Sequence, residues 1–150
     1  MSAGPAHWVV DASVGILLFV PETYSPQAQI FFDRLTADVP DYFYVPDLFY
    51  AECANIFWKY VQRHGYSASV AKKEISALKT LRLRSVSSAD LMEKALELAL
   101  RWDITAYDAC YLALSEKLRA PLVTADERLA RRVKGLNPRV EWIGNFPLIK

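Results

Sequence analysis

The sequence predicts an α/β sandwich built around a parallel β-sheet. Short segments that are apolar throughout alternate along the chain with longer segments in which apolar residues recur at helical spacing. Strands buried on both faces of a parallel sheet have the first pattern, and the helices that cover such a sheet have the second. Because the 150 residues are 53% hydrophobic and 23% charged, we expect one globular domain over residues 1–150.

Each expected element follows from its local pattern, beginning with the apolar strand His7–Val10, which ends at Asp11 where a helical pattern starts. In chain order, the elements after it are a helix at 26–37, a strand at 42–45, helices at 46–63 and 68–80, a strand at 81–86, a helix that ends at 102, a helix at 105–118, a strand at 121–123, a helix at 127–133 and a strand at 140–143. At 81–86 the strand is predicted by apolar residues that alternate with Arg82 and Arg84.

Polar residues and a glycine mark where the helices begin and end. Asp47, Ser67, Ser87 and Thr105 each come just before a helical segment, where a side-chain oxygen can accept hydrogen bonds from the free amides of the first turn. Gly65 is expected to end the helix that Asp47 opens, because glycine readily adopts the left-handed conformation found after helix ends.

Charge, hydropathy and cysteine content restrict the class of protein. The longest apolar run, at 14–20, is far below the roughly 20 residues needed to cross a bilayer. The first residues lack the basic start of a secretory signal, so we expect a cytoplasmic protein without a membrane span. Cys53 and Cys110 lie in apolar helical segments and are expected to be reduced core thiols. The net charge of +1 argues against a protein that coats nucleic acid, but not against a metal-dependent nuclease.

Four carboxylates are expected at the carboxyl ends of the strands, where ligands bind in open α/β sheets. Asp11 follows the first strand, Asp126 follows the strand at 121–123, and Asp108 lies in the first turn of the helix before that strand. Glu52 comes early in the helix after the second strand, so its side chain can point back to the same end. Because carboxylates gathered at one place repel one another, they would either hold protons or bind a divalent cation.

A cation at such a site would be Mg²⁺ or Mn²⁺, since carboxylate oxygens completed by water suit these ions and the chain has no His or Cys cluster that would favour zinc. Each acid also has a structural explanation. Asp11 and Asp126 could each cap the helix that follows, and Asp108 lies three residues after Thr105, as in a capping box. Glu52 is the hardest to explain in this way, because its neighbours are apolar and a carboxylate there needs a partner.

The segments VVDAS, PDLFYAECANIFWK, TAYDACYLALSE and PLVTADERLA carry the four acids in this order. In this combination the chain closely resembles the PIN-domain family, and in particular the toxin endonucleases of VapC type, from about Trp8 to Ile143. The resemblance implies a three-layer α/β/α sandwich with about five parallel strands, and Mg²⁺- or Mn²⁺-dependent cleavage of RNA that leaves 5′-phosphate and 3′-hydroxyl ends. It also implies the toxin of a type II toxin–antitoxin pair, with an antitoxin protein as partner, and a homodimer.

The resemblance gives each acid a role in the reaction. Asp11 and Asp108 would be the main ligands of one or two metal ions. Glu52 would bind directly or through water, and Asp126 would complete the cluster or bind a second ion.

Three polar residues are expected beside these acids. Thr124 matches the hydroxyl residue that often precedes the last acid of PIN domains, and Ser13 matches a small polar position after the first acid. Asn55 lies three residues beyond Glu52 on the same helix face, where its amide could hydrogen-bond to the site or serve only as a surface or packing group.

Basic and aromatic side chains offer two candidate surfaces. A basic rim could bind RNA phosphates, although charges on helix faces are usually only solvated. Its members are Arg82, Arg84, Arg101, Arg128, Arg131, Arg132 and Lys134. Aromatic residues are dense around the second strand and the helix after it, where most are expected in the core and the excess suits a subunit interface. These are Tyr42, Phe43, Tyr44, Phe49, Tyr50, Phe57, Trp58 and Tyr60.

Other functions remain open at this point. A non-catalytic PIN scaffold that binds RNA or protein and a solitary RNA-processing nuclease are both compatible with the four acids. A receiver-like phosphoacceptor domain would have an acidic pair at the end of the first strand, and Asp11 has no acidic neighbour. A phosphatase with an aspartyl nucleophile would have a second acid where Ser13 stands.

Overall fold

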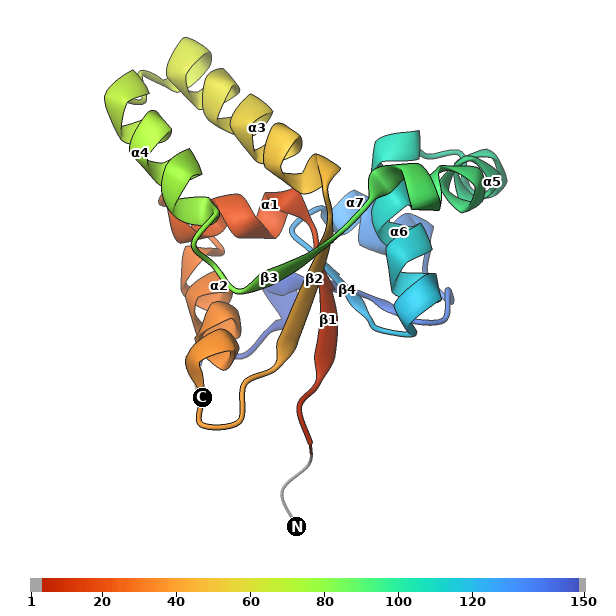
Figure 1. The fold of residues 1–150 in the computed structure, drawn as a ribbon. Helices are drawn as coiled ribbons and strands as arrows, with labels where there is room; N and C mark the ends of the chain where they lie inside the picture. Colours follow the sequence, from red (N-terminus) through yellow and green to blue (C-terminus); the bar gives the residue numbers. More distant parts are fainter. Residues whose placement is uncertain (1–3, 149–150) are drawn as a thin grey trace.

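Five parallel strands form one sheet in the computed structural model, which describes residues 4–148 (Figure 1). The strands are β1 (His7–Val10), β2 (Tyr42–Pro46), β3 (Leu83–Val86), β4 (Leu122–Thr124) and β5 (Val140–Trp142). Their order across the sheet is β3-β2-β1-β4-β5, and every neighbouring pair is parallel. The strand order therefore switches at β1, and the carboxyl ends of β1 and β4 lie side by side where an α/β sheet commonly binds its ligand.

Helices cover both faces of this sheet and confirm the predicted three layers. They are α1 (Ala12–Gly15), α2 (Ser25–Phe32), α3 (Leu48–His64), α4 (Ala68–Leu78), α5 (Met92–Trp102), α6 (Ala106–Leu118) and α7 (Glu127–Arg132), with 3₁₀ turns η1 (Ile16–Leu18), η2 (Asp33–Thr36), η3 (Ser88–Leu91) and η4 (Ile143–Asn145). α1 and α2 lie on one face, and α6 lies on the other with α5 packed against it (Figure 1). α3 and α4 form an antiparallel hairpin that projects beyond the carboxyl ends of the strands.

The core is apolar on both faces of the sheet. Trp8 and Phe43 are neighbours in the register of β1 and β2. Phe31 of α2 stacks on Phe43 with ring centroids 4.5 Å apart and meets Trp8 edge-on. On the opposite face, residues 109–115 of α6 are buried, and this helix contacts β1, β2 and β4. Burial on both faces explains why the central strands β1 and β4 end in consecutive buried residues, whereas the edge strand β3 has none.

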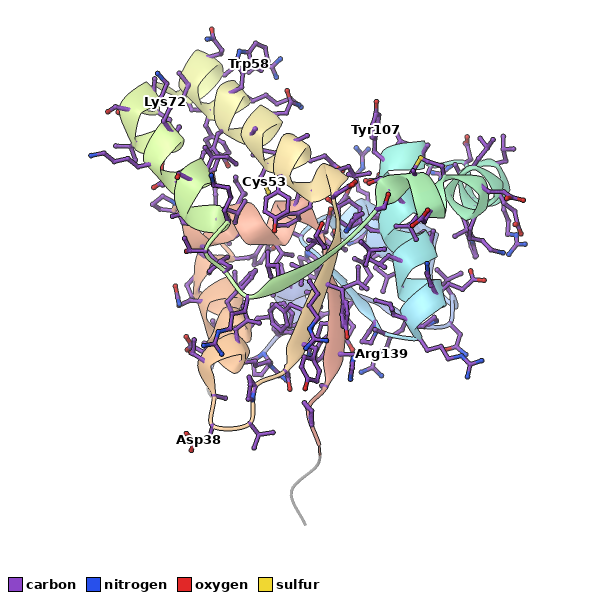
Figure 2. The ribbon with its side chains drawn as sticks, viewed as in Figure 1. Asp38, Cys53, Trp58, Lys72, Tyr107 and Arg139 are labelled. Carbon is purple, nitrogen blue, oxygen red and sulfur yellow. The ribbon has the colours of Figure 1, made fainter. Side chains whose placement is uncertain are left out.

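The cysteines and most of the aromatic residues lie where the sequence predicts. Cys53 and Cys110 are free and buried, and Phe43 and Phe57 belong to the core. Trp58 differs, because its side chain is 54% exposed. Figure 2 shows Cys53 near α1 and Trp58 farther along the α3–α4 hairpin.

Several elements are shorter than predicted, and backbone hydrogen bonds explain two of them. The helix expected at 26–37 ends at Phe32 and continues as the 3₁₀ turn η2, where the Arg34 carbonyl accepts the amide of Asp41 across the following loop. The strand expected at 81–86 begins at Leu83, because the amides just before it fold back onto carbonyls at the end of α4. No helix within residues 4–148 is both long and apolar enough to cross a membrane.

Three of the predicted helix boundaries are confirmed. Ser67 accepts the amide of Val70 at the start of α4, and Thr105 accepts the amide of Asp108 at the start of α6. Gly65 follows α3 in the left-handed conformation with φ of 65°.

The helix caps predicted at Asp47 and Ser87 are wrong, since neither side chain accepts an amide of the helix that it precedes. Asp47 Oδ1 instead accepts the backbone N–H of Ser88 at 3.0 Å and also the Ser88 hydroxyl. The Ser88 hydroxyl oxygen in turn accepts the Leu48 N–H at 3.2 Å. The starts of α3 and η3 therefore satisfy each other's free amides, which local patterns cannot predict because Asp47 and Ser88 are 41 residues apart.

Candidate active site

Asp11 lies at the carboxyl end of β1, next to β4. Its backbone N–H donates to the carbonyl of Val123 at 3.0 Å, and the residue is only 6% exposed. Oδ2 of its carboxylate accepts hydrogen bonds from the hydroxyls of Ser13 and Thr124, both at 2.7 Å. These two predicted neighbours therefore fix the orientation of the Asp11 carboxylate.

The same two hydroxyls connect Asp11 to the loop that follows β4. Ser13 Oγ accepts the backbone N–H of Ala125, and Thr124 Oγ1 accepts that of Asp126, both at 3.0 Å. Each hydroxyl thus donates its single proton to Asp11 and accepts an amide with a lone pair. Asp11 makes no capping hydrogen bond with α1, so the structural explanation of this acid does not hold.

The environment of Asp11 disfavours an unpaired negative charge. Burial raises the pKa of Asp11 above its ordinary value, while the hydrogen bonds from Ser13 and Thr124 act in the opposite direction. The nearby negative charge of Asp126 raises the pKa of Asp11 further. The carboxylate is therefore bonded on one oxygen but remains electrostatically suited to a cation.

Glu52 extends from α3 and is partly buried. Its Oε1 is buried and has no hydrogen-bond partner among the residues that the structure describes. Burial, with the charges of Asp11 and Asp108 in addition, raises the pKa of Glu52 to about 7, and the neighbouring hydroxyl of Tyr111 opposes this change. A buried carboxyl oxygen without a partner is costly in a purely structural role.

Asp108 is held in place by the start of α6. Its backbone N–H donates to Thr105 Oγ1 at 3.1 Å, which fixes where the helix begins. Burial raises the pKa of Asp108 to about 6, with contributions from the charges of Asp11 and Asp126 and an opposing effect of the Thr105 hydroxyl. The capping role therefore belongs to Thr105, and the Asp108 carboxylate lies within electrostatic reach of Asp11 and Asp126.

Asp126 has a structural role as well. Its side chain is exposed, and Oδ1 accepts the backbone N–H of Leu129 at 3.1 Å as the cap of α7. It also supplies negative charge to the site, because it raises the pKa of both Asp11 and Asp108.

Asp11 and Asp108 each lie within electrostatic reach of the other three acids, but the four acids do not form a complete set of metal ligands. Within residues 4–148, no three His, Cys, Asp or Glu side chains are close enough to hold a metal ion together. The donors still suit a hard cation, because they are all oxygens and Glu52 Oε1 lacks any other partner. Mg²⁺ keeps several of its waters and is commonly held by only one or two carboxylates, so an incomplete set of protein ligands is compatible with its binding.

Asn55 makes no side-chain hydrogen bond to the acids within the described residues. Its side chain is exposed on α3 and makes no hydrogen bond with Glu52 or with any other residue in the described part of the chain. Its role near the site stays a prediction.

A groove of about 540 Å³ opens beside two of the acids. Its polar lining consists of Asp103, Thr105, Asp108, Asp126, Arg128 and Arg132. Asp103 ends α5 in the left-handed conformation with φ of 52°. It also forms an ion pair with Arg132 at 3.0 Å. Sequence reasoning could have found the turn, because Asp tolerates positive φ, but not a partner 29 residues away.

The predicted basic rim is not one surface. Arg84 lies over the ring of Tyr42, with its Cζ 4.1 Å from the ring centroid, and Arg101 pairs with Glu97 on α5. Of the seven residues predicted for the rim, only Arg128 and Arg132 line the groove that contains Asp108 and Asp126.

Comparison with known proteins supports the fold and the reaction class. Residues 8–135 match the PIN domain family. The chain is 35% identical over 132 residues to "Ribonuclease VapC3" of Pyrobaculum aerophilum, and the match covers 85% of this chain and 95% of that relative. The structure of PAE2754 from Pyrobaculum aerophilum has a TM-score of 0.66 at 21% identity, covering 91% of this chain and 83% of that one. A chain of a toxin–antitoxin complex from Klebsiella pneumoniae has a TM-score of 0.59 at 17% identity, covering 88% and 98%.

Proposed function

This chain belongs to the PIN-domain family, and from that premise we propose that it is an endoribonuclease that hydrolyses RNA phosphodiester bonds. The observation that carries the proposal is the buried Asp11 carboxylate, held by Ser13 and Thr124 where the strand order switches. The relative from Pyrobaculum aerophilum is named a ribonuclease, which supports the same reaction class. That residues 1–150 form a single domain stays a prediction.

Mg²⁺ or Mn²⁺, as one or two ions, is the proposed cofactor. Asp11 and Asp108 would be the main ligands, Glu52 would bind directly or through water, and Asp126 would complete the cluster or bind a second ion. When bound, such an ion polarises the phosphodiester and lowers the pKa of the attacking water. The raised pKa values of Glu52 and Asp108 support this assignment, because a cation would relieve the repulsion that contributes to them.

The chain's own residues would orient the reaction and accept its proton. Ser13 and Thr124 keep the Asp11 carboxylate in one orientation, and Thr105 fixes the turn that carries Asp108. We assign the proton released by the attacking water to Glu52 Oε1, because this oxygen has no other partner among the described residues and the pKa of Glu52 is near neutrality.

We further propose that the protein is the cytoplasmic toxin of a type II toxin–antitoxin pair, active as a homodimer and blocked by an antitoxin. The toxin–antitoxin complex from Klebsiella pneumoniae supports the proposal of an antitoxin partner, because one of its chains shares this fold. Large apolar side chains exposed on α3, α5 and α6 supply surface for protein partners. Trp58 is 54% exposed, Leu100 77% and Tyr107 68%, and Figure 2 shows Tyr107 projecting from the start of α6.

Cleavage of a labelled structured RNA with Mg²⁺ or Mn²⁺ tests the nuclease. We expect cleavage that stops with EDTA and in Asp11→Asn and Asp108→Asn, each shown to be folded by circular dichroism. Asp38→Asn is the matched control, because Asp38 is exposed and lies at the opposite end of the molecule (Figure 2). It should cleave like the unmodified protein.

Other outcomes favour the alternatives. No cleavage together with no metal binding by calorimetry would favour a non-catalytic PIN scaffold that binds RNA or protein. Cleavage without an adjacent reading frame that encodes an inhibitor would favour a solitary RNA-processing nuclease.

A further inference from the structure

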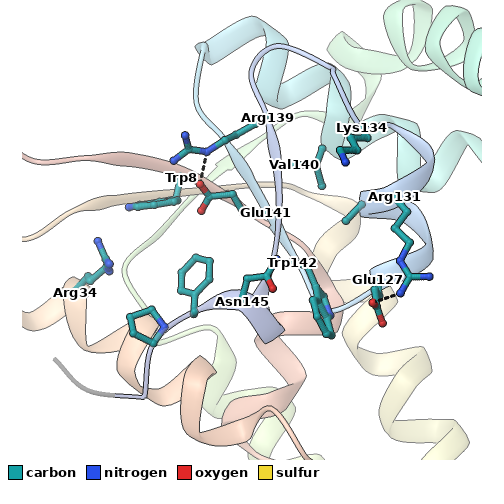
Figure 3. Close-up of a pocket in the computed structure, with 13 residues that line it drawn as sticks. Trp8, Arg34, Glu127, Arg131, Lys134, Arg139, Val140, Glu141, Trp142 and Asn145 are labelled. Atoms are coloured by element: carbon teal, nitrogen blue, oxygen red, sulfur yellow. Dashed lines mark hydrogen bonds and ion pairs between the residues drawn. The ribbon is translucent and has the colours of Figure 1, made fainter.

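Helix α7 separates two grooves and presents different cations to each. Arg128 and Arg132 line the groove of about 540 Å³ that contains Asp108 and Asp126, which we call the acid-side groove. Arg131 and Lys134 line a second groove of about 610 Å³ that runs along β5 (Figure 3), which we call the β5 groove. The β5 groove contains none of the four acids.

The two arginines of the acid-side groove differ in how they are held. Arg132 pairs with Asp103 and donates from Nε to the carbonyl of Trp102 at 2.9 Å, so its guanidinium is anchored to the end of α5. Arg128 is exposed, and its guanidinium makes no ion pair or hydrogen bond with any of residues 4–148. Its donors are therefore available to a ligand that enters beside Asp108 and Asp126.

RNA that enters the acid-side groove needs a positively charged side chain there. The acids repel phosphates, and the net charge of +1 provides no general attraction that would offset this repulsion. A guanidinium presents several N–H donors in a planar arrangement that matches phosphate oxygens.

We propose that the acid-side groove binds the RNA backbone next to the bond that is cleaved, with Arg128 in contact with a phosphate and Arg132, anchored by Asp103, as a positioning residue. This assignment rests on the proposed ribonuclease function. It makes Arg128 a substrate-binding residue rather than a solvated surface charge.

The β5 groove is the alternative path, and its cations are less available. Figure 3 shows Arg131 paired with Glu127 and Arg139 paired with Glu141 on the groove's own walls. Arg34 pairs with Asp41 at 3.5 Å and also lies over the ring of Trp8. Only Lys134 among the cations of this groove has no such partner within the described residues.

Two arginines on one helix make a matched test. Binding of labelled RNA would be measured over a range of salt concentrations with Ca²⁺ in place of Mg²⁺, and kcat and KM with Mn²⁺. For Arg128→Gln we expect about tenfold weaker binding, a salt slope smaller by about 0.7, a higher KM and little change in kcat. Arg128→Lys should keep the salt slope because it keeps the charge. Arg131→Gln should match the unmodified protein.

The outcomes separate this inference from the function on which it rests. Unchanged binding in Arg128→Gln would contradict RNA binding in the acid-side groove. A larger loss in Arg131→Gln or Lys134→Gln would also contradict it and would indicate a ribonuclease that binds RNA along β5. If the unmodified protein neither binds nor cleaves RNA, the proposed function fails together with this inference.

Discussion

The hydroxyl of Thr124 donates to Oδ2 of Asp11 at 2.7 Å and joins the ends of two neighbouring strands, although the two residues are 113 positions apart. Thr124 is completely buried, and its oxygen also accepts the backbone N–H of Asp126. One side chain thus sets the orientation of a buried carboxylate and the course of the loop that carries another acid. This relationship leads to the first prediction.

Replacing Thr124 by Val should impair both stability and cleavage. Valine has a similar volume but no hydroxyl, so the buried Asp11 carboxylate and the Asp126 amide each lose a partner. We expect a loss of about 1–3 kcal/mol in the free energy of unfolding and cleavage slower by roughly 10–100-fold. Urea unfolding and single-turnover cleavage would measure these. Thr124→Ser, which retains the hydroxyl, is the control, and a Val variant equal to it would contradict the prediction.

The metal-free protein should lose stability as the pH rises toward neutrality. The pKa of Glu52 is about 7 and that of Asp108 about 6, above their ordinary values of 4.5 and 3.8. Between the ordinary and the raised values, the folded state keeps protons that the unfolded state has released, so the free energy of unfolding decreases with pH. Urea unfolding in EDTA at pH 5 and pH 8 would show the decrease.

Glu52→Gln should reduce this pH dependence, because the amide does not ionise. The variant should be more stable than the unmodified protein at pH 8 and closer to it at pH 5. Glu93→Gln, at an exposed position of α5, is the control and should retain the full dependence. An equal dependence in Glu52→Gln would show that Glu52 does not contribute.

Added Mg²⁺ or Mn²⁺ should raise the melting temperature, and more at pH 8 than at pH 5, because the carboxylates must lose their protons to bind the ion. An ion that binds only the folded state at 100 times its Kd adds about 2.7 kcal/mol to the free energy of unfolding. Thermal melts with and without EDTA would measure the shift. Asp11→Asn should remove most of it, and a full shift in that variant would assign the ion to another place.

Removing the Phe31 ring should strongly destabilise the fold. The ring is fully buried between Phe43, Trp8 and Phe146. Phe31→Ala should therefore lower the free energy of unfolding by about 3–5 kcal/mol. Phe31→Leu fills more of the space and should cost less. Denaturant unfolding compares the two, and equal losses would contradict the expectation that filling the space reduces the cost.

Much of the fold could be predicted because the strands carry a strong local signal. A strand buried on both faces is apolar throughout, and residues 7–10 and 42–45 have this pattern. Element ends were harder to predict where the decisive hydrogen bond is long-range. Asp47 precedes a helix and has the composition of a cap, yet its carboxylate bonds Ser88, to which no local pattern points.

The candidate site shows the same limit. The position of Asp11 after an apolar strand and of Asp108 after a capping threonine could be predicted from neighbouring residues. The distribution of the basic residues between the two grooves could not be predicted, because adjacent positions such as Arg131 and Arg132 line different grooves on the two sides of α7. The ion pair between Asp103 and Arg132 could not be predicted either, because it depends on how α5 and α7 come together in the folded chain.

The pairing of β1 with β4 has a consequence for synthesis of the chain on the ribosome. Asp11 is made before its partners Val123 and Thr124, and Asp126 follows them. A nascent chain that ends before β4 has neither the second hydroxyl for Asp11 nor the last acid. The site is therefore assembled only after β4 has emerged and paired with β1, so a nascent chain that contains only β1, β2 and β3 lacks it.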